Sequence, residues 1–176
     1  MHLDGTHTFN APKELIWEML LNPEVLAKIT PGVKTLEPTE EGKFNIVSSV
    51  KLGPVNGSFS GEMEVADQVK PESFTLRMKQ TSKIGNVNAE GSISLKTVEG
   101  NQTEVAFTGD AKLSGTLART GQRVLSGVAR TMTNQFFSSL EKEITAAMPA
   151  EEIKKDTQGL WARFIAWLKR LFGSGE

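Results

Sequence analysis

The sequence predicts an α+β domain in which a curved antiparallel sheet wraps around one long helix near its C-terminal end. Three observations lead to this fold class. Alternation of apolar and polar residues with a period of two dominates residues 33–113, which is typical of strands. Helical periodicity follows over residues 120–148, and turn signals that contain Gly or Pro separate the alternating runs. A chain of 176 residues is long enough for one such domain with an appended element.

The N-terminal part predicts one strand and two short helices. Residues 3–9 alternate loosely and form the strand. A helix follows from Pro12, with Asn10 as its expected N-cap because an Asn side chain can accept hydrogen bonds from the first helical N–H groups. The Asn22-Pro23 pair ends this helix, and residues 24–29 are expected to form the second one.

Six strands are predicted between residues 33 and 113. In the run from Val55 to Val65, every odd position is apolar or Gly and every even position is polar. The runs around Ile46, Leu76, Ile93 and Phe107 alternate in the same way. Consecutive strands joined by short turns form an antiparallel meander, which has one wet face and one covered face.

The element expected to cover the inner face of this sheet is a long helix from about Thr120 to Met148, which Pro149 ends. Together, one strand, two helices, six strands and a long helix describe the helix-grip arrangement. The apolar side chains of the long helix recur at helical spacing: Val124, Leu125, Val128, Met132, Phe136, Leu140 and Ile144.

The inner face of the sheet is poor in side-chain volume. Three strands, 55–65, 87–95 and 105–113, hold sixteen inward positions, of which six are Gly or Ala. Since protein interiors are packed to a density of about 0.74, this face either bends and packs closely on the helix or leaves an apolar ligand cavity. In the cavity interpretation, Ser48 and Gln80 are the polar groups that would bind a ligand carbonyl. The predicted lining residues are Ser48, Val50, Gly57, Phe59, Met63, Leu76, Met78, Gln80, Gly91, Phe107, Gly109, Val128, Met132 and Phe136.

The composition is poor in catalytic groups. There is no Cys, and the two histidines, His2 and His7, have opposite parity on the first strand, so they cannot share a face. No metal-ligand spacing and no Ser-His-Asp set is visible, so no catalytic or metal-binding residue is assigned. His7 is expected to be a surface or edge residue, and an acid–base role could fall only to His7 and Asp110. The balance of 20 Lys and Arg against 21 Asp and Glu argues against a nucleic-acid partner.

The C-terminal residues predict a separate amphipathic helix. Residues 149–159 form a charged linker after a domain over 1–148, residues 160–172 form the helix, and 173–176 are a flexible end. Its apolar side chains fall on one arc of about 160°, and its polar face holds no acid. This composition favours binding in the interface of an anionic membrane, although such a helix can also pack on its own domain or on a partner. The predicted membrane-binding residues are Leu160, Trp161, Arg163, Phe164, Ile165, Trp167, Leu168, Lys169, Arg170, Leu171 and Phe172.

Three stretches resemble signatures of the G-subunit family of carbon monoxide dehydrogenase, a branch of the START-like (SRPBCC) superfamily. They are Ile-Thr-Pro-Gly at 29–32, Leu-Gly-Pro-Val-Asn-Gly-Ser-Phe at 52–59 and Gly-Thr-Leu-Ala-Arg-Thr-Gly-Gln-Arg at 115–123. The resemblance covers about residues 1–148. It implies a START-like helix-grip domain that acts beside a molybdenum-containing carbon monoxide dehydrogenase and has no catalytic role of its own.

The resemblance also implies what this domain would carry. Its ligand would be menaquinone or a similar isoprenoid quinone, passed between the membrane and the enzyme, and it would hold no other cofactor. The expected location is cytoplasmic, peripheral on the inner face of the cell membrane. Two alternatives remain at this point: a recruitment or assembly factor that carries no ligand, and a generic START-like binder of hydrophobic small molecules.

Overall fold

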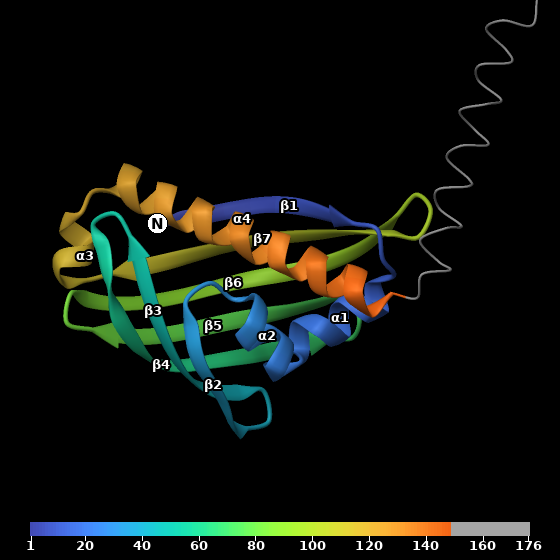
Figure 1. Cartoon of the computed structure of the whole chain (residues 1–176), viewed down its shortest axis with the longest axis horizontal. Helices are drawn as coiled ribbons and strands as arrows, with labels where there is room; N and C mark the ends of the chain where they lie inside the picture. Colours follow the sequence, from blue (N-terminus) through green and yellow to red (C-terminus); the bar gives the residue numbers. More distant parts are fainter. Residues whose placement is uncertain (149–176) are drawn as a thin grey trace, which may run out of the picture.

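The computed structural model describes residues 1–148 and has the predicted α+β architecture, with its helices on one face of a curved antiparallel sheet (Figure 1). The expected linker, amphipathic helix, flexible end and membrane-binding residues at 149–176 lie outside the described residues. The elements in chain order are β1 (His2–Phe9), α1 (Lys13–Leu21), α2 (Pro23–Ile29), β2 (Val33–Glu40), β3 (Lys43–Leu52), β4 (Val55–Val69), β5 (Ser73–Ser82), β6 (Gly85–Val98), β7 (Gln102–Leu113), α3 (Gly115–Arg119) and α4 (Gln122–Ala147).

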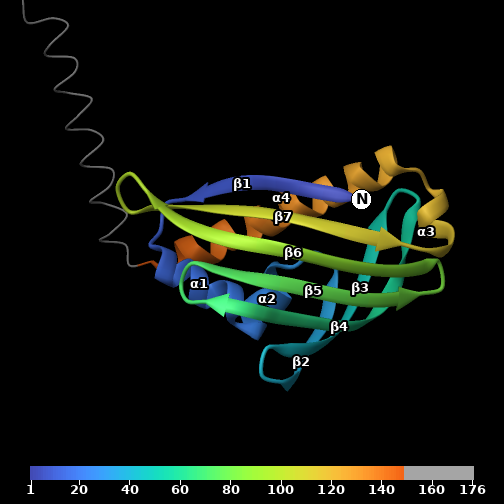
Figure 2. The ribbon, with the colours of Figure 1, turned by 180° about the vertical axis from the view of Figure 1, so that it is seen from behind.

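The seven strands form one sheet in the order β1-β7-β6-β5-β4-β3-β2, and every neighbouring pair is antiparallel. Strands β2 to β7 follow one another as hairpins, whereas β1 pairs with β7, with His2 opposite Asp110 and Phe9 opposite Thr103. Therefore β1 and β2, which are joined through α1 and α2, occupy opposite edges. Seen from behind, the other face of the sheet carries none of the helices described over residues 1–148 (Figure 2).

The long helix begins slightly later than expected. Its first turn is preceded by the short helix α3, and Gly121 separates the two with a φ of +92°, a backbone conformation that Gly adopts without steric strain. Val124 is 42% exposed, so its predicted place on the covered face is wrong, and Phe137 is buried instead. Neither α4 nor any other helix described over residues 1–148 has the length and apolar character needed to cross a membrane.

The N-cap predicted for α1 is also wrong. The cap position is Pro12, which has no capping side chain, and the Asn10 side chain accepts a hydrogen bond from Gln102 instead. The residue that does cap a helix is Asn22, at the start of α2. Its Oδ1 accepts hydrogen bonds from the backbone N–H groups of Glu24 at 2.9 Å and Val25 at 3.3 Å.

Replacing Asn22 with Ala is expected to lower the free energy of unfolding by about 1 kcal/mol, because two N–H groups at the start of α2 lose their acceptor. Urea denaturation of the variant and the wild type measures this difference. Asn10→Ala is the matched control, since it removes only a surface contact and should cost less than about 0.5 kcal/mol. Equal losses in the two variants would contradict the capping role of Asn22.

The uncovered face of the sheet is polar and is tied together by Arg77 on β5. Its guanidinium hydrogen-bonds Glu90 on β6 at 2.8 Å and Asp67 on β4 at 3.1 Å, and lies 3.5 Å from Glu64. The hydrogen bond to Glu90 raises the pKa of Arg77 above its usual value. Because these groups are exposed, water screens their attraction, and the network adds little to stability.

Candidate ligand cavity

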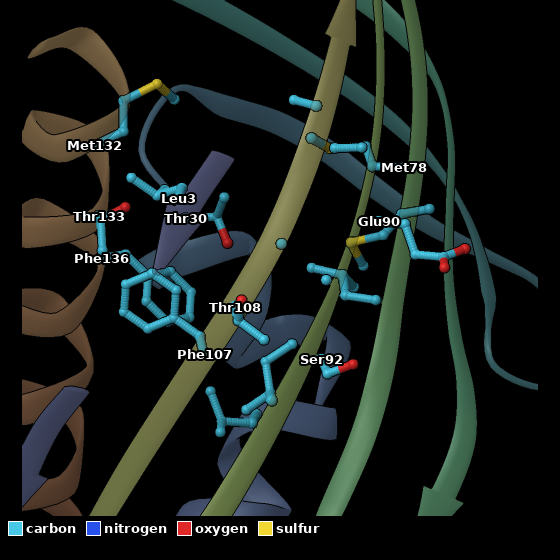
Figure 3. A pocket seen from close by; sticks show the side chains of 18 of the residues that line it. Leu3, Thr30, Met78, Glu90, Ser92, Phe107, Thr108, Met132, Thr133 and Phe136 are labelled. Carbon is cyan, nitrogen blue, oxygen red and sulfur yellow. The ribbon is translucent and has the colours of Figure 1, made fainter. Parts of the chain in front are cut away.

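A cavity of about 370 Å³ lies between the sheet and α4 and is partly open to the surface (Figure 3). It separates two hydrophobic clusters. Along α4, Leu125 belongs to one cluster, Met132 and Phe136 line the cavity, and Leu140 belongs to the other cluster. The larger cluster includes Phe9, Trp17, Ile46, Leu95, Leu140 and Ile144. The smaller cluster consists of Val55, Phe59, Leu117 and Leu125, with partly buried neighbours.

Small residues on two neighbouring strands create this hollow. In the pairing of β6 with β7, Ala89 lies opposite Ala111 and Gly91 lies opposite Gly109. All four line the cavity. The residues on either side along both strands are larger, and they belong to the two packed clusters. Four adjacent positions with little or no side chain therefore leave a space that α4 does not fill.

Other small residues on the inner face serve close packing rather than the cavity. A Cβ atom built on Gly61 would lie 1.9 Å from the Lys79 carbonyl oxygen, so at this point β4 and β5 approach too closely for any side chain. Gly57 faces Ile84 at ordinary contact distance and does not line the cavity. The Gly- and Ala-rich face therefore combines close packing with a hollow, and Gly109 takes part in both, because it lines the cavity while a Cβ atom built on it would lie 2.8 Å from the Glu90 carbonyl oxygen.

The structure brings together eight of the fourteen predicted lining residues. The wall contains Met63, Leu76, Met78, Gly91, Phe107, Gly109, Met132 and Phe136. The other six lie off the wall, and their predicted place on the cavity is corrected: Ser48, Val50, Gly57, Phe59, Gln80 and Val128. Val50, Phe59 and Val128 pack in the smaller cluster, at the end of the sheet beyond the cavity.

Ser48 and Gln80 face inward as predicted, but they bind each other. The Gln80 Nε2 donates a hydrogen bond to the Ser48 Oγ at 3.1 Å, and both residues are buried. Because a buried polar group needs a partner, this pair satisfies its own requirement inside the packed part of the sheet. The expected contact with a ligand carbonyl is therefore not available from the cavity wall.

Sequence reasoning missed several wall residues. Leu3 and Ala111 share the inward parity of their strands, so the alternation could have placed them. Thr30 and Pro31 come from the connection between α2 and β2, and no periodic signal places a connection beside a distant helix. Figure 3 shows Leu3, Thr30 and Phe107 around the same space as Met132 on α4.

The wall is suited to an apolar molecule. Few polar side chains of the wall face the cavity, and those of Thr30 and Thr133 are among them. Glu90 contributes its main chain beside the two glycines, while its side chain points to the outer face, as Figure 3 shows. Three aromatic rings, those of Phe107, Phe136 and Phe137, stand at one end of the cavity. Burial of apolar ligand surface against such a wall is favourable in proportion to the area removed from water.

The two residues considered for acid–base chemistry lie on opposite faces of the sheet. Asp110 is on the outer face, where its carboxylate lies 3.1 Å from the His2 Nδ1 in an exposed pair. His7 lies on the edge strand β1, as expected, but it faces inward and is half-buried, stacked on Phe137 with the ring centroids 5.0 Å apart. Within residues 1–148, no three His, Asp or Glu side chains gather in a metal-binding arrangement.

Comparison with solved structures places this geometry among START-like folds. A conserved protein from Geobacillus kaustophilus is 31% identical with a TM-score of 0.81, over 84% of this chain and 97% of that chain. The Zhui aromatase/cyclase from a Streptomyces species is 17% identical with a TM-score of 0.66, over 86% of this chain and 97% of that chain. A START superfamily protein from Mycobacterium smegmatis is 11% identical with a TM-score of 0.64, over 84% of this chain and 99% of that chain. The last two likenesses show the fold alone.

The sequence comparisons are more specific. No curated protein matches the chain. Among protein families, residues 5–145 match CoxG, the G-subunit family of carbon monoxide dehydrogenase. The match runs from within β1 to the last turn of α4 and includes all the lining residues of the cavity except Met1 and Leu3.

Proposed function

The chain belongs to the CoxG family of carbon monoxide dehydrogenase, and from this premise we propose that it is a non-catalytic accessory protein that binds menaquinone and supplies it to a molybdenum-containing carbon monoxide dehydrogenase. The observation that carries this proposal is the partly open, apolar cavity between the sheet and α4. Small-molecule sites have volumes of about 300–1,000 Å³ and mainly apolar walls with few polar groups. Membership of the family supports the proposal that the partner is carbon monoxide dehydrogenase. The apolar cavity supports the proposal that the ligand is a hydrophobic small molecule.

The volume, the open side and the aromatic rings of the cavity support a ligand with a planar ring and a long apolar tail. Its volume of about 370 Å³ is at the lower end of the usual range, so a long isoprenoid chain would be only partly enclosed. The part of the isoprenoid chain that the cavity does not enclose would extend out through its open side. The rings of Phe107, Phe136 and Phe137 offer stacking partners for a naphthoquinone head.

Extraction of the purified full chain tests the ligand. Organic extraction followed by mass spectrometry is expected to show an isoprenoid quinone that co-purifies, or that binds in near-stoichiometric amount after incubation with menaquinone in detergent. A sample unfolded in urea and treated in the same way is the control for nonspecific adsorption. If native protein retains no more quinone than unfolded protein, the proposal is wrong.

The proposed location is the inner surface of the cell membrane, where the ligand resides. The support for it is the sequence of residues 160–172, whose Trp, Phe and Leu are spaced so that a helix would carry them on one face, opposite Lys and Arg. Such a segment would hold the carrier at the bilayer surface while the domain over residues 1–148 exchanges its ligand.

Deletion of residues 160–176 is expected to weaken binding to vesicles that contain anionic lipid by at least about hundredfold, since three basic residues contribute about 1 kcal/mol each and the apolar face adds to this. Vesicle co-sedimentation measures the loss. The double change of Trp161→Glu and Phe164→Glu should act in the same direction, because charge on the apolar face opposes its burial in lipid. Equal sedimentation before and after the deletion would rule out this membrane role.

One observation favours a second function, recruitment or assembly of the enzyme without ligand carriage. None of the helices in the described part of the chain covers the outer face of the sheet, which bears charged side chains around Arg77 and so suits a protein contact that needs no cavity (Figure 2). The two functions differ in one requirement. Ligand supply depends on the volume of the cavity, and recruitment does not.

A further inference from the structure

His7 has one unsatisfied buried atom beside the aromatic end of the cavity. Its Nε2 is the only buried side-chain nitrogen or oxygen in residues 1–148 that has no hydrogen-bond partner there. The imidazole stacks on Phe137 with an interplanar angle of 5° and is tilted against Phe9, with the centroids 4.5 Å apart. A polar ring thus lies in an otherwise aromatic cluster.

Such an atom is costly. A buried group without a hydrogen bond loses its contact with water and gains nothing in return, whereas an apolar ring of the same shape would be neutral or stabilising at this position. Native structures contain few such groups, and each of them calls for an explanation. Packing alone does not supply the reason here, because the Phe9 and Phe137 rings present only apolar surface to the imidazole.

The position of His7 relative to the cavity suggests the reason. On the inner face of β1, Leu3 lines the cavity, Gly5 follows, and His7 is next. The Phe107 ring covers Gly5, and a Cβ atom there would lie 2.8 Å from its Cζ. Phe107 and Phe137 both line the cavity, and their centroids are 5.6 Å apart. His7 itself is not on the wall, but it stacks on Phe137, which is, and the Phe107 ring lies over Gly5, between Leu3 and His7 along the strand.

We propose that His7 is the polar subsite of the cavity, and that its Nε2–H donates a hydrogen bond to a carbonyl oxygen of the bound ligand when the Phe107 ring moves off Gly5. This inference rests on the proposed function and deepens it, because it assigns the ligand to the class of apolar ring compounds that bear a carbonyl. Movement of Phe107 is sterically simple, since the ring is the far end of a side chain and Gly5 presents no side chain of its own. Ser48 and Gln80 are not alternatives, because they bind each other.

Two probes that differ only in the carbonyl groups test the proposal. Menadione (2-methyl-1,4-naphthoquinone) has two carbonyls, and 2-methylnaphthalene has the same carbon skeleton without them. Calorimetric titration of the full chain gives the affinity of each probe for the wild type and for His7→Phe. Comparing the ratio of the two affinities in His7→Phe with the same ratio in the wild type cancels differences in hydrophobicity between the probes, as in a double-mutant cycle.

His7→Phe is expected to weaken menadione binding about fivefold to tenfold, the usual value of one hydrogen bond, and to leave 2-methylnaphthalene binding unchanged. His2→Phe, on the outer face of the same strand, is the matched control and should change neither affinity. The Tm of His7→Phe should equal or exceed that of the wild type, because the substitution removes an unsatisfied group. An unchanged affinity ratio in His7→Phe would overturn the proposal.

A measurement on the wild type makes the test independent of any variant. The ¹⁵N resonances of the His7 imidazole, assigned by comparison with His2→Phe, should shift on addition of menadione and stay in place with 2-methylnaphthalene. Equal responses to both probes would overturn the role of His7. If neither probe binds at all, it is the proposed function of the cavity that fails, and the two failures are thereby distinguished.

Discussion

Replacing Ala89 with Phe is expected to prevent menaquinone loading, with a loss of affinity of at least tenfold, or about 1.4 kcal/mol of binding free energy. Ala89 lies on the floor of the cavity between Met78 on β5 and Ala111 on β7, so a larger side chain must project into the space that the ligand needs. The fold should tolerate this change, because the new ring occupies existing space and not a packed contact.

The matched control is Ala106→Phe, which places the same ring on the outer face of β7. Quinone content after detergent loading measures the effect, and circular dichroism verifies that both variants are folded. Coupled assays with the enzyme partner then separate the two functions. A folded Ala89→Phe protein that still supports quinone reduction by the dehydrogenase would show that the chain acts by recruitment and not by ligand supply.

Replacing Gly61 with Ala is expected to destabilise the domain by roughly 3 kcal/mol, which would be a large part of the stability of a protein of this size. The added Cβ would lie 1.9 Å from the Lys79 carbonyl oxygen and 2.8 Å from the Gln80 Cα. Both are backbone atoms of β5, so the clash cannot be relieved by a rotamer change. Either β4 and β5 separate locally or the sheet bends, and both responses disturb the pairing of Gly61 with Gln80.

Gly57→Ala is the control for Gly61→Ala. The two glycines are four residues apart on the inner face of β4, but the nearest atom to a Cβ at Gly57 is the Ile84 Cδ1 at 3.4 Å, a flexible side-chain end. We expect a change of less than about 0.5 kcal/mol for this variant. Urea denaturation gives both values. Similar values for the two glycines would show that the approach of β5 to β4 is not what requires Gly61.

The fold could be predicted from the sequence because it depends on periodicity. Alternation sets which side chains of each strand face inward, and the runs between residues 43 and 113 keep that parity in the structure. The inward positions of Phe59, Met63 and Phe107 follow from this rule alone. Short turns between consecutive strands then leave an antiparallel meander as the simplest arrangement. The covering helix follows from its own period of 3.6 residues.

The candidate site could be predicted only in part, because parity gives the face of a residue and not its neighbours. Gly57, Gly61 and Gly91 look alike in the sequence, yet one faces Ile84, one meets the backbone of β5, and one lines the cavity. The difference arises from strand register and from where α4 crosses the sheet. Neither quantity is encoded within a single strand.

Local patterns in the chain were thus enough to establish the α+β class, the inward face of each strand, and the shortage of side-chain volume on that face. Only the tertiary structure shows at which positions on that face the missing side-chain volume leaves a cavity. It lies where Ala89, Gly91, Gly109 and Ala111 become neighbours through the pairing of β6 with β7. The parity of β1 puts His7 on the same face as Leu3 and Phe9, but its stacking on Phe137 depends on where α4 lies relative to β1. Contacts of this kind between distant segments depend on register and helix placement, which periodicity does not specify.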